Sequence, residues 1–277
     1  MKEQVVDLYR EFGLSKRDVV LLPMSLKERI GHLFLCPRKE AAGRLYCYDV
    51  DPSEAKPAML IFPGGGYKNN SRSEWENIAE AYAARGFRTF VLNYSVKYFK
   101  YPTQLNEAVM AIAYIKKHSA ALGVSDKVVV CGFSAGGHLA STLSCLYADD
   151  SIHPRLRGLD ARPDACVLSY PVISAADGVR NEMSFHYLCG EDTALRQALS
   201  LEYCVRDATP PTFLWHTRED DFVPCENSIR YAAALEKHGV PHKLVLYEKG
   251  EHGLNLAKGY EAEKWIDEAT EFLKQYM

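Results

Sequence analysis

The sequence contains no long apolar run, no paired cysteine motif and no block of like charges. No stretch approaches the roughly 20 apolar residues that a transmembrane helix needs, and the charged opening MKEQVVDLYREFGLSKRD differs from a secretory signal peptide. The eight cysteines are scattered singly, so they favour a reducing compartment over a disulfide framework or a zinc site. We therefore expect a cytoplasmic protein without a membrane span and without a bound metal.

Charge of one sign is also scarce. The 277 residues carry a formal net charge of -3, and no basic stripe or basic-aromatic patch stands out. A nucleic-acid partner would require such a patch, so we expect none, and we expect a small or neutral substrate instead. No linker rich in Pro, Ser or Gly divides the chain, which predicts one domain over residues 1–277.

One stretch combines a buried strand, a sharp turn and a helix. Residues 127–146 read KVVVCGFSAGGHLASTLSCL, in which a β-branched run is followed by apolar residues at helical spacing. Between them, residues 132–136 read GFSAG and fit G-x-S-x-G, a motif whose small residues let the backbone turn and expose a serine above a sheet. This context favours Ser134 as a nucleophile over a serine that only caps the helix.

The rest of the chain alternates buried strands with amphipathic helices. Strands that are apolar on both faces and separated by helices predict a mainly parallel sheet with helices on both faces, an α/β fold. The predicted strands are 58–62, 87–93, 128–130, 165–169, 212–216 and 243–247, and the predicted helices are 71–84, 104–118, 225–238 and 260–276. Functional side chains of such sheets gather at the carboxyl ends of the strands.

Two segments depart from this alternation. Before it, residues 1–18 have the pattern of a short helix, and 31–36 with 44–50 predict an antiparallel hairpin at the edge of the sheet. Within it, residues 171–209 form a longer polar and aromatic insertion with two helical patterns. The insertion fits a small lid over the active end of the sheet, and equally a pair of crossover helices without substrate contact.

The chain offers this serine a base and a carboxylate further downstream. A serine hydroxyl is a weak nucleophile unless a base takes its proton, and on this kind of sheet the order is Ser, then Asp or Glu, then His. The strand 212–216 ends in the acidic loop TREDDFVP, and the strand 243–247 ends in EKGEHG. We therefore expect His252 as the general base and an acidic residue of 217–224 as the carboxylate that orients it.

The other histidines fit the role of base less well. His238 and His242 flank the last strand at its amino end, away from the expected site. His138 lies one helical turn after Ser134 and is interpreted as a packing or hydrogen-bonding support. His216 is interpreted as a structural residue beside the acidic loop, which leaves the histidine of EHG as the candidate base.

A glycine-rich loop supplies candidate donors for the oxyanion that forms when a serine attacks a carbonyl. FPGGGY, residues 62–67, directly follows the strand 58–62, where this architecture holds the oxyanion with backbone N–H groups. Ala135, the residue after the nucleophile, is expected to supply a further N–H. The alternatives are a flexible turn or a phosphate-binding loop, but neither G-x-x-x-x-G-K-[ST] nor G-x-G-x-x-G is present.

Together these motifs resemble the α/β-hydrolase superfamily, and within it the small carboxylesterases related to hormone-sensitive lipase and to bacterial acetyl and acetyl-xylan esterases. The esterase H-G-G-G loop appears as PGGGY, and the other matching segments are GFSAGGHLA, PPTFLWHTREDDFVP and EHGLNLA. The resemblance spans residue 58 to the C-terminus, whereas residues 1–56 match no motif. Pro63 stands in place of the loop histidine, so other contacts must hold the glycines here.

The resemblance implies an α/β-hydrolase fold and a serine esterase that forms an acyl-enzyme. It places the orienting carboxylate at Asp220, with Asp221 as the alternative, and it matches Gly65 and Gly66 to the oxyanion positions. It implies no metal or organic cofactor. The implied substrate is a short-chain, acetyl-type ester of a sugar or small alcohol.

Tyr67, Tyr94 and Tyr170 each follow a strand end and are candidates for the pocket wall or for packing. A prolyl-oligopeptidase-like peptidase or an arylformamidase would share the fold and the triad. A catalytically silent binding module is the third alternative, although such a protein would usually have lost one of the three triad residues.

Overall fold

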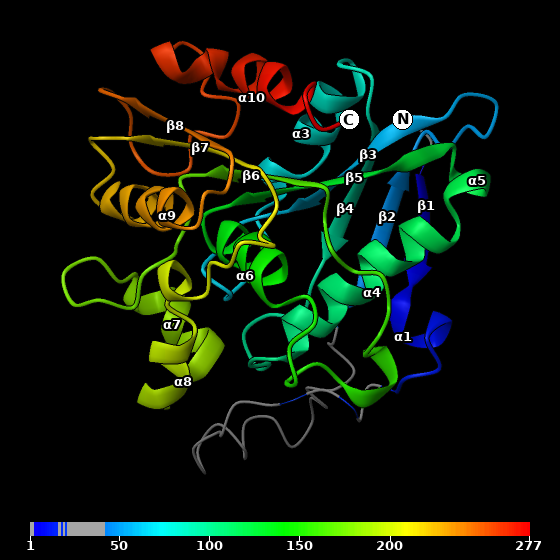
Figure 1. Cartoon of the computed structure of the whole chain (residues 1–277), viewed down its shortest axis with the longest axis horizontal. Coiled ribbons are helices and arrows are strands. Elements are labelled where there is room, and N and C mark those ends of the chain that lie inside the picture. Colours follow the sequence, from blue (N-terminus) through cyan, green and yellow to red (C-terminus); the bar gives the residue numbers. More distant parts are fainter. Residues whose placement is uncertain (1–2, 16–17, 19, 21–41) are drawn as a thin grey trace.

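The computed structural model of the protein describes residues 3–15, 18, 20 and 42–277. Within these residues, eight strands form one sheet, in the order β1-β2-β4-β3-β5-β6-β7-β8 (Figure 1). The strands are β1 Glu3–Asp7, β2 Arg44–Tyr48, β3 Lys56–Phe62, β4 Arg88–Asn93, β5 Val124–Phe133, β6 Ala165–Ser169, β7 Thr212–Thr217 and β8 His242–Tyr247. The pairs from β4 to β8 are parallel, and β1 and β2 join antiparallel, which confirms the predicted mainly parallel sheet.

Helices cover both faces of the sheet, as the sequence predicts. On one face lie α3 Glu76–Ala83 and α10 Trp265–Leu273, and on the other lie α4 Thr103–Lys117, α6 Ala135–Leu146 and α9 Glu226–Lys237 (Figure 1). Two hydrophobic clusters result, one on each face, and every residue of β6 and β7 is buried between them. Strands that are buried on both faces read as continuous apolar runs, which is why the sequence revealed them.

The N-terminal prediction is wrong in part. Residues 3–7 form the strand β1, not a helix, and pair with β2 in a register that sets Val5 opposite Tyr46, while the short helix α1 follows at Leu8–Glu11. β1 is exposed at nearly every position, so no alternation of apolar and polar residues marks it as a strand. β2 consequently lies inside the sheet and not at its edge, and the predicted strand 31–36 lies outside the described residues.

Two predicted helices begin with a tighter turn. The segment predicted as 71–84 starts with the 3-10 turn η2 Arg72–Glu74, breaks at Trp75 and continues as α3. Trp75 has φ -113° and ψ -98°, which is outside the helical region. The segment predicted as 260–276 likewise starts with η5 Glu261–Lys264 before α10. The break at Trp75 matters for the site because Glu74, just before it, is buried.

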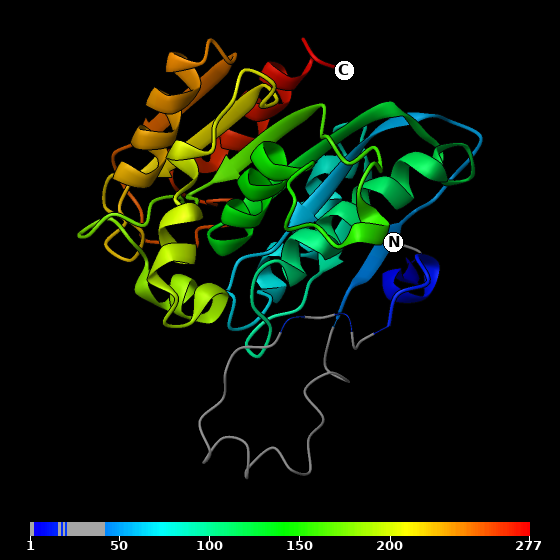
Figure 2. The same cartoon turned by 60° about the horizontal axis from the view of Figure 1, so that its bottom comes forward.

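The insertion lies beside α6 and α9, at the opposite side of the molecule from β1 and α1 (Figure 1, Figure 2). It contains α7 Glu182–Cys189, α8 Thr193–Ala198 and the 3-10 turn η4 Leu201–Tyr203. Asn181 caps α7 by accepting from the Ser184 amide, and Asp192 caps α8 in the same way. The remaining short elements are α5 Ser119–Leu122 and η3 Pro154–Leu156.

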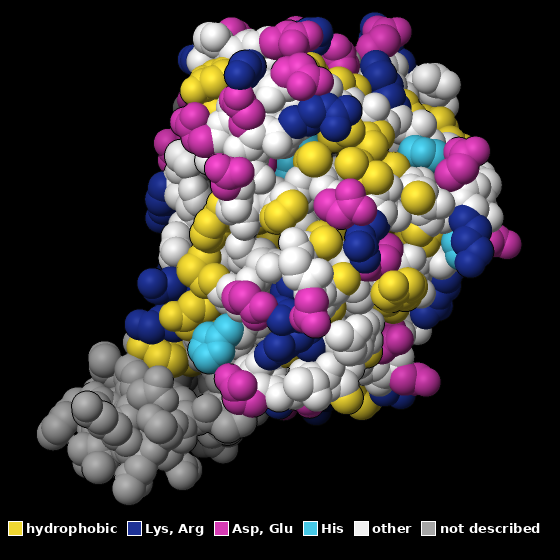
Figure 3. Space-filling model, turned by 90° about the vertical axis from the view of Figure 1, so that its left-hand side faces the viewer, with side chains coloured by type: hydrophobic (Ala, Val, Ile, Leu, Met, Phe, Trp, Pro, Cys, Tyr) yellow, Lys and Arg dark blue, Asp and Glu magenta, His cyan; other side chains and the backbone are white. Residues whose placement is uncertain are grey.

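The described part of the chain has no helix of the length and apolarity needed to cross a membrane. On the face drawn in Figure 3, the described Lys and Arg side chains are mixed with Asp and Glu side chains, and no large patch of one sign forms.

Candidate active site

Ser134 occupies the sharp turn between β5 and α6. Its backbone has φ 52° and ψ -117°, a left-handed conformation that L residues rarely adopt and that is typical of functional positions. Small neighbours make the turn possible, since a Cβ at Gly132 would lie 2.2 Å from the Gly136 carbonyl oxygen and a Cβ at Gly136 would lie 2.0 Å from the Phe62 oxygen. Glycines at these positions therefore allow the backbone to turn tightly enough to present the serine.

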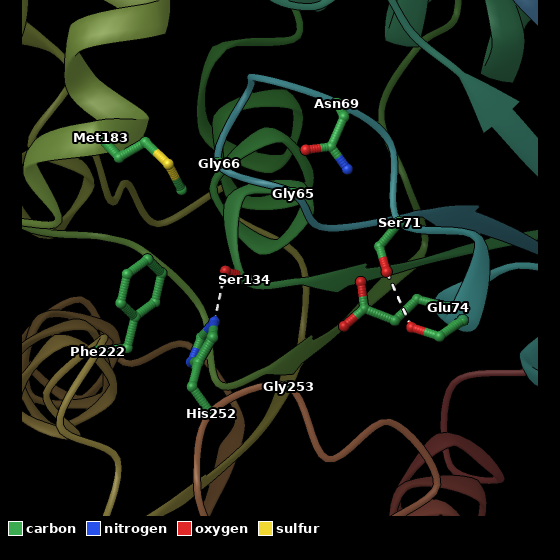
Figure 4. A pocket seen from close by; sticks show the side chains of 11 residues that line it. Gly65, Gly66, Asn69, Ser71, Glu74, Ser134, Met183, Phe222, His252 and Gly253 are labelled. Atoms are coloured by element: carbon green, nitrogen blue, oxygen red, sulfur yellow. Dashed lines mark hydrogen bonds between the residues drawn. The ribbon is translucent and has the colours of Figure 1, made fainter.

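His252 joins this serine to an acidic residue, as the order of motifs predicts. Its Nε2 lies 2.8 Å from the Ser134 Oγ (Figure 4), and its Nδ1 lies 2.6 Å from the Asp220 Oδ2. Because the carboxylate accepts from Nδ1–H, Nε2 is left to accept from the serine hydroxyl. A serine placed in this way can lose its proton to the imidazole as it attacks an electrophile.

Asp220, and not Asp221, faces the histidine. Its side chain is buried and accepts from the amides of Phe222 (3.1 Å) and Val223 (2.8 Å), whereas Asp221 is exposed. Burial by itself would raise the pKa of Asp220, but hydrogen bonds from His216 and His252 hold it well below its usual range. The carboxylate therefore stays charged beside the imidazole.

His216 is a buried hydrogen-bond partner of Asp220. Its ring is fully buried, with Nε2 2.8 Å from the Val223 carbonyl oxygen and 3.2 Å from the Asp220 Oδ2. The Ser228 hydroxyl lies 2.8 Å from Nδ1 and satisfies it. This placement matches the interpretation of His216 as a structural residue close to the site.

The glycine loop, residues 63–67, lies next to Ser134 and is held by contacts other than a histidine at position 63. The Tyr94 hydroxyl donates to the Pro63 carbonyl (2.5 Å), and the Gly64 amide donates to the Glu74 Oε2 (2.7 Å). Gly65 and Gly66 have φ +123° and +63°, and a Cβ on Gly65 would lie 2.1 Å from the Asn69 carbonyl oxygen, so the loop needs glycine there. These contacts take the place of the missing loop histidine.

Ser134, His252 and the glycine loop line one cavity of about 240 Å³. Met183 and Phe222 lie on one side of the Ser134–His252 pair, and Asn69, Ser71 and Glu74 lie on the other (Figure 4). The full lining is Gly65, Gly66, Asn69, Ser71, Ser73, Glu74, Ser134, Met183, Phe222, His252 and Gly253. The cavity thus has one apolar wall and one polar wall, with Ser134 between them.

The insertion supplies one wall of this cavity. Met183, at the start of α7, packs against the glycine loop so closely that a Cβ at Gly66 would lie 2.3 Å from its Cε. Phe222 completes the wall, half exposed and with its ring centroid 5.2 Å from that of His252. Segment 171–209 therefore reaches the cavity, and its movement as a lid stays a prediction.

The three candidate tyrosines lie behind the cavity and not on its surface. All are buried, with Tyr67 bonded to His138 Nδ1 (3.0 Å), Tyr94 to Pro63 and Tyr170 to the Glu74 Oε1 (2.7 Å). They orient the loops that form the site. Sequence reasoning missed the side chains that do line the cavity, namely Asn69, Ser71, Ser73, Glu74, Met183 and Phe222.

His138 is a buried support, as predicted, and it is neutral. Its Nε2 donates to the Leu199 carbonyl (3.0 Å), so its Nδ1 accepts from the Tyr67 hydroxyl and ties the glycine loop to the insertion. Burial lowers the pKa of His138 from 6.5 to about 4. The ring therefore carries no charge at neutral pH.

We expect the neutral His138 to make the fold sensitive to acid. The unfolded chain takes up this proton at a higher pH than the folded chain, so stability present above pH 6.5 is lost as the pH falls toward 4. Between pH 7 and pH 4.5 the loss from this residue amounts to about 2 kcal/mol in the free energy of unfolding. Denaturant unfolding at about pH 7 and about pH 4.5 measures it, and His138→Gln should show a smaller acid loss than the wild type. Equal losses in both proteins would contradict this assignment.

Within residues 3–15, 18, 20 and 42–277, no three His, Cys, Asp or Glu side chains are placed to hold a metal ion. The side chains that line the cavity offer three serine hydroxyls, the His252 imidazole, the Glu74 carboxylate and the Asn69 amide, and Asp220 bonds to the imidazole from outside the cavity. A hydroxyl, an imidazole and a carboxylate joined in the order Ser134, His252, Asp220 are the groups used in acyl transfer through a serine.

A family model described as BD-FAE matches residues 45–235 of the chain. Endo-1,4-beta-xylanase B of Butyrivibrio fibrisolvens is 35% identical over 226 residues, 77% of this chain and 35% of that protein. Acetylxylan esterase of Xylanibacter ruminicola is 24% identical over 273 residues, 94% of this chain and 53% of that protein. The chain thus spans about a third to a half of the length of these two relatives.

A solved structure matches over nearly the full length of both chains. The acetyl ester-xyloside bifunctional hydrolase from Caldicellulosiruptor lactoaceticus aligns with a TM-score of 0.80 at 36% identity and covers 93% of this chain and 96% of that one. Together with the sheet order and the two helical layers, this match confirms the predicted α/β-hydrolase fold. The chain belongs to the BD-FAE family, among the α/β-hydrolase esterases.

Proposed function

We propose that the protein is a serine esterase that hydrolyses carboxylic esters through an acyl-enzyme. One observation carries the proposal: the Ser134 Oγ lies 2.8 Å from His252 Nε2, and the other ring nitrogen lies 2.6 Å from Asp220. The named activities of similar proteins, acetylxylan esterase and acetyl ester-xyloside hydrolase, support it.

The proposed reaction uses each of these groups in turn. Ser134 Oγ attacks the ester carbonyl while its proton passes to His252 Nε2, and Asp220 stabilises the imidazolium that forms. His252 then gives the proton to the leaving alcohol, and an acyl group remains on the serine. Water repeats the sequence, with its proton taken by His252, and releases the acid and free Ser134.

Backbone N–H groups are proposed to hold the oxyanion. The candidates are those of Gly65, Gly66 and Ala135, in the glycine loop and at the first residue of α6. Donors that are fixed in position before the reaction stabilise the developing charge without reorganisation, and each contributes about 100- to 1,000-fold in rate. The residues that hold the glycine loop therefore matter for catalysis even when they do not touch the substrate.

For the substrate we propose a short-chain, acetyl-type ester of a sugar or small alcohol. A cavity of about 240 Å³ is smaller than the pockets that enclose drug-sized ligands, which favours a small acyl group. The polar side chains of Asn69, Ser71 and Ser73 in the cavity wall offer hydrogen bonds of the kind that hydroxyl groups need. We expect this site to bind a small-molecule ester. We expect it to bind no cofactor, metal or nucleic acid.

A series of p-nitrophenyl esters with increasing acyl length tests this proposal. We expect kcat/KM to be highest for acetyl to butyryl esters and to fall by about tenfold or more at the octanoyl ester, because the longer chain cannot be held in the cavity. Release of acetate from acetylated xylose tests the sugar ester in the same assay set. A preference for octanoyl over acetyl esters would contradict the short-chain proposal.

Matched amides separate the esterase from its two enzymatic alternatives. Acetanilide and formanilide carry an acetyl or a formyl group on an amine leaving group. A peptidase or an arylformamidase would cleave one of these two amides at a rate comparable to that for p-nitrophenyl acetate. We expect the ester to be preferred because an amine is the poorer leaving group and needs a well-placed acid. A catalytically silent binding module would cleave none of the three.

A further inference from the structure

The active-site cavity is lined by one buried carboxylate, that of Glu74, which the proposed reaction does not use. It lies in η2, its side chain lines the cavity, and the residue is only 4% exposed. Within the described part of the chain no Lys or Arg forms an ion pair with it. A buried carboxylate without a cation is costly, so its surroundings show what it is bound to.

One carboxylate oxygen holds the glycine loop. The Gly64 amide donates to Oε2 at 2.7 Å, and this peptide leads directly into Gly65 and Gly66. A Cβ at Gly64 would lie 2.8 Å from the same oxygen and 3.0 Å from the Ser134 Cβ, so the carboxylate, the loop and the nucleophile are in close contact. Glu74 thereby fixes the orientation of the chain just before the proposed oxyanion donors.

The other oxygen holds the loop that carries the histidine, residues 248–257. The Tyr170 hydroxyl donates to Oε1 at 2.7 Å and accepts from the Asn255 amide at 3.0 Å. The Tyr170 ring also packs edge-on against His252, with centroids 5.0 Å apart and planes at 72°. Tyr170 therefore contacts both the Glu74 carboxylate and the His252 imidazole and fixes one relative to the other.

Asn255 adds a second connection between the histidine loop and η2. Its side-chain amide donates to the Ser73 carbonyl, next to Glu74 in η2, and its Oδ1 accepts from Asn77 Nδ2 at 3.1 Å. Asn255 has φ +63°, a conformation that its short polar side chain tolerates. The η2 segment is thus bonded to the histidine loop and to the glycine loop at once.

We propose that Glu74 is a positioning residue that sets the glycine loop and the histidine loop at the separation that ester hydrolysis requires. The inference rests on the proposed esterase function. Two donors approach the carboxylate from different loops, so two acceptor oxygens are needed at one point. Burial raises the pKa of Glu74, whereas the bonds from Tyr170 and Gly64 favour the charged form.

Glutamine cannot replace this carboxylate fully. Its single oxygen would accept from the Gly64 amide, which leaves its NH2 facing Tyr170. The Tyr170 hydroxyl, which already accepts from Asn255, would then lose the acceptor for its own proton. The variant E74Q keeps the size of the side chain but frees the tyrosine and removes the charge.

The test compares E74Q with E107Q, a second replacement of a buried carboxylate. Glu107 in α4 is fully buried and accepts from the Tyr9 hydroxyl (2.6 Å) and the Ser95 amide (2.6 Å). With p-nitrophenyl acetate we expect E74Q to lower kcat by about 10- to 100-fold with KM little changed, and E107Q to leave kcat within about twofold. Thermal unfolding of both variants verifies that each protein is folded.

A trifluoromethyl ketone distinguishes positioning from a general structural role. Its carbonyl carbon bonds to Ser134 Oγ, the serine proton passes to His252 and the carbonyl electron pair moves to oxygen, which gives an oxyanion without a leaving group. We expect E74Q to weaken this inhibitor by about the same factor as kcat/KM, because both depend on the same donors. A variant that is merely less stable would keep the wild-type inhibition constant once the folded fraction is counted.

Tyr170→Phe provides a second variant if E74Q folds poorly. It keeps the bond from Glu74 to Gly64 and removes only the hydroxyl that leads to the histidine loop, so a smaller fall in kcat, again at nearly constant KM, is expected. The inference is overturned if the wild type is an active esterase and both variants keep wild-type kcat and inhibitor affinity. A wild type without esterase activity would instead overturn the proposed function.

Discussion

Replacing Ser134 with alanine is expected to lower kcat for an ester by about a millionfold, close to the background rate. The structure gives the reason, since the Ser134 Oγ lies within hydrogen-bond distance of His252 Nε2, whereas the other two hydroxyls that line the cavity, those of Ser71 and Ser73, bond to each other. Without it no acyl-enzyme can form, and only the oxyanion donors and substrate binding remain. Hydrolysis of p-nitrophenyl acetate by purified variant protein measures the loss.

Ser144→Ala serves as the matched control for this change. Ser144 lies in α6, the helix that begins directly after Ser134, is buried, and donates to the Ala140 carbonyl (2.8 Å), away from the active-site cavity. It should keep wild-type kcat, with at most a small loss of stability from the missing hydrogen bond. A Ser134→Ala protein that retains a tenth or more of the wild-type rate would mean that another group performs the attack.

Asp220→Asn is expected to lower kcat by about ten-thousandfold, the loss known for the same change in serine proteases. The asparagine amide can present an N–H where the carboxylate accepted the Nδ1 proton, so His252 adopts the wrong tautomer for taking the serine proton. KM should change little, because Asp220 does not line the cavity. Steady-state kinetics with the same ester separate the two constants.

Asp221→Asn tests whether this carboxylate has been assigned to the right residue. Asp221 is adjacent in sequence but exposed, and its replacement should leave kcat within a few-fold of the wild type. The sequence left both residues open on its own, and the motif resemblance preferred Asp220. A larger loss in Asp221→Asn than in Asp220→Asn would refute the geometry around His252.

The sequence predicted the positions of the central strands and the order of the three candidate residues for one physical reason. Ser134, Asp220 and His252 each follow the carboxyl end of a parallel strand, and such ends meet at one edge of the sheet. Ser134 and His252 are 118 positions apart in the sequence. The topology nevertheless predicts that they lie close together. Local motifs and a general rule of topology were sufficient.

The walls of the cavity could not be predicted in this way. Met183 comes from the insertion and Phe222 from the loop after β7, and neither belongs to a local pattern that marks it as a contact. Glu74 was hidden for a different reason, because the predicted continuous helix left no sign of the break at Trp75 that accompanies its inward position. Contacts between separate loops depend on tertiary packing, which sequence periodicity does not report.

The N-terminal strand illustrates the same limit at the edge of the sheet. β1 is held by backbone hydrogen bonds to β2 and buries almost no side chain, so its sequence carries no alternation. Pro63, by contrast, is a departure from the motif that the sequence itself indicates, and the structure shows that Tyr94 and Glu74 hold the glycine loop with proline at this position. The departure at Pro63 thus marked the part of the site where other contacts hold the glycine loop.

Reaction with a fluorophosphonate followed by peptide mass spectrometry tests the central claim most directly. An activated serine attacks phosphorus and displaces fluoride, which leaves a stable phosphonyl group on its oxygen. We predict a single adduct on Ser134 in the folded wild type, none after denaturation, and none in Ser134→Ala. An unlabelled folded protein, or an adduct on another residue, would contradict the assignment of Ser134 as the nucleophile.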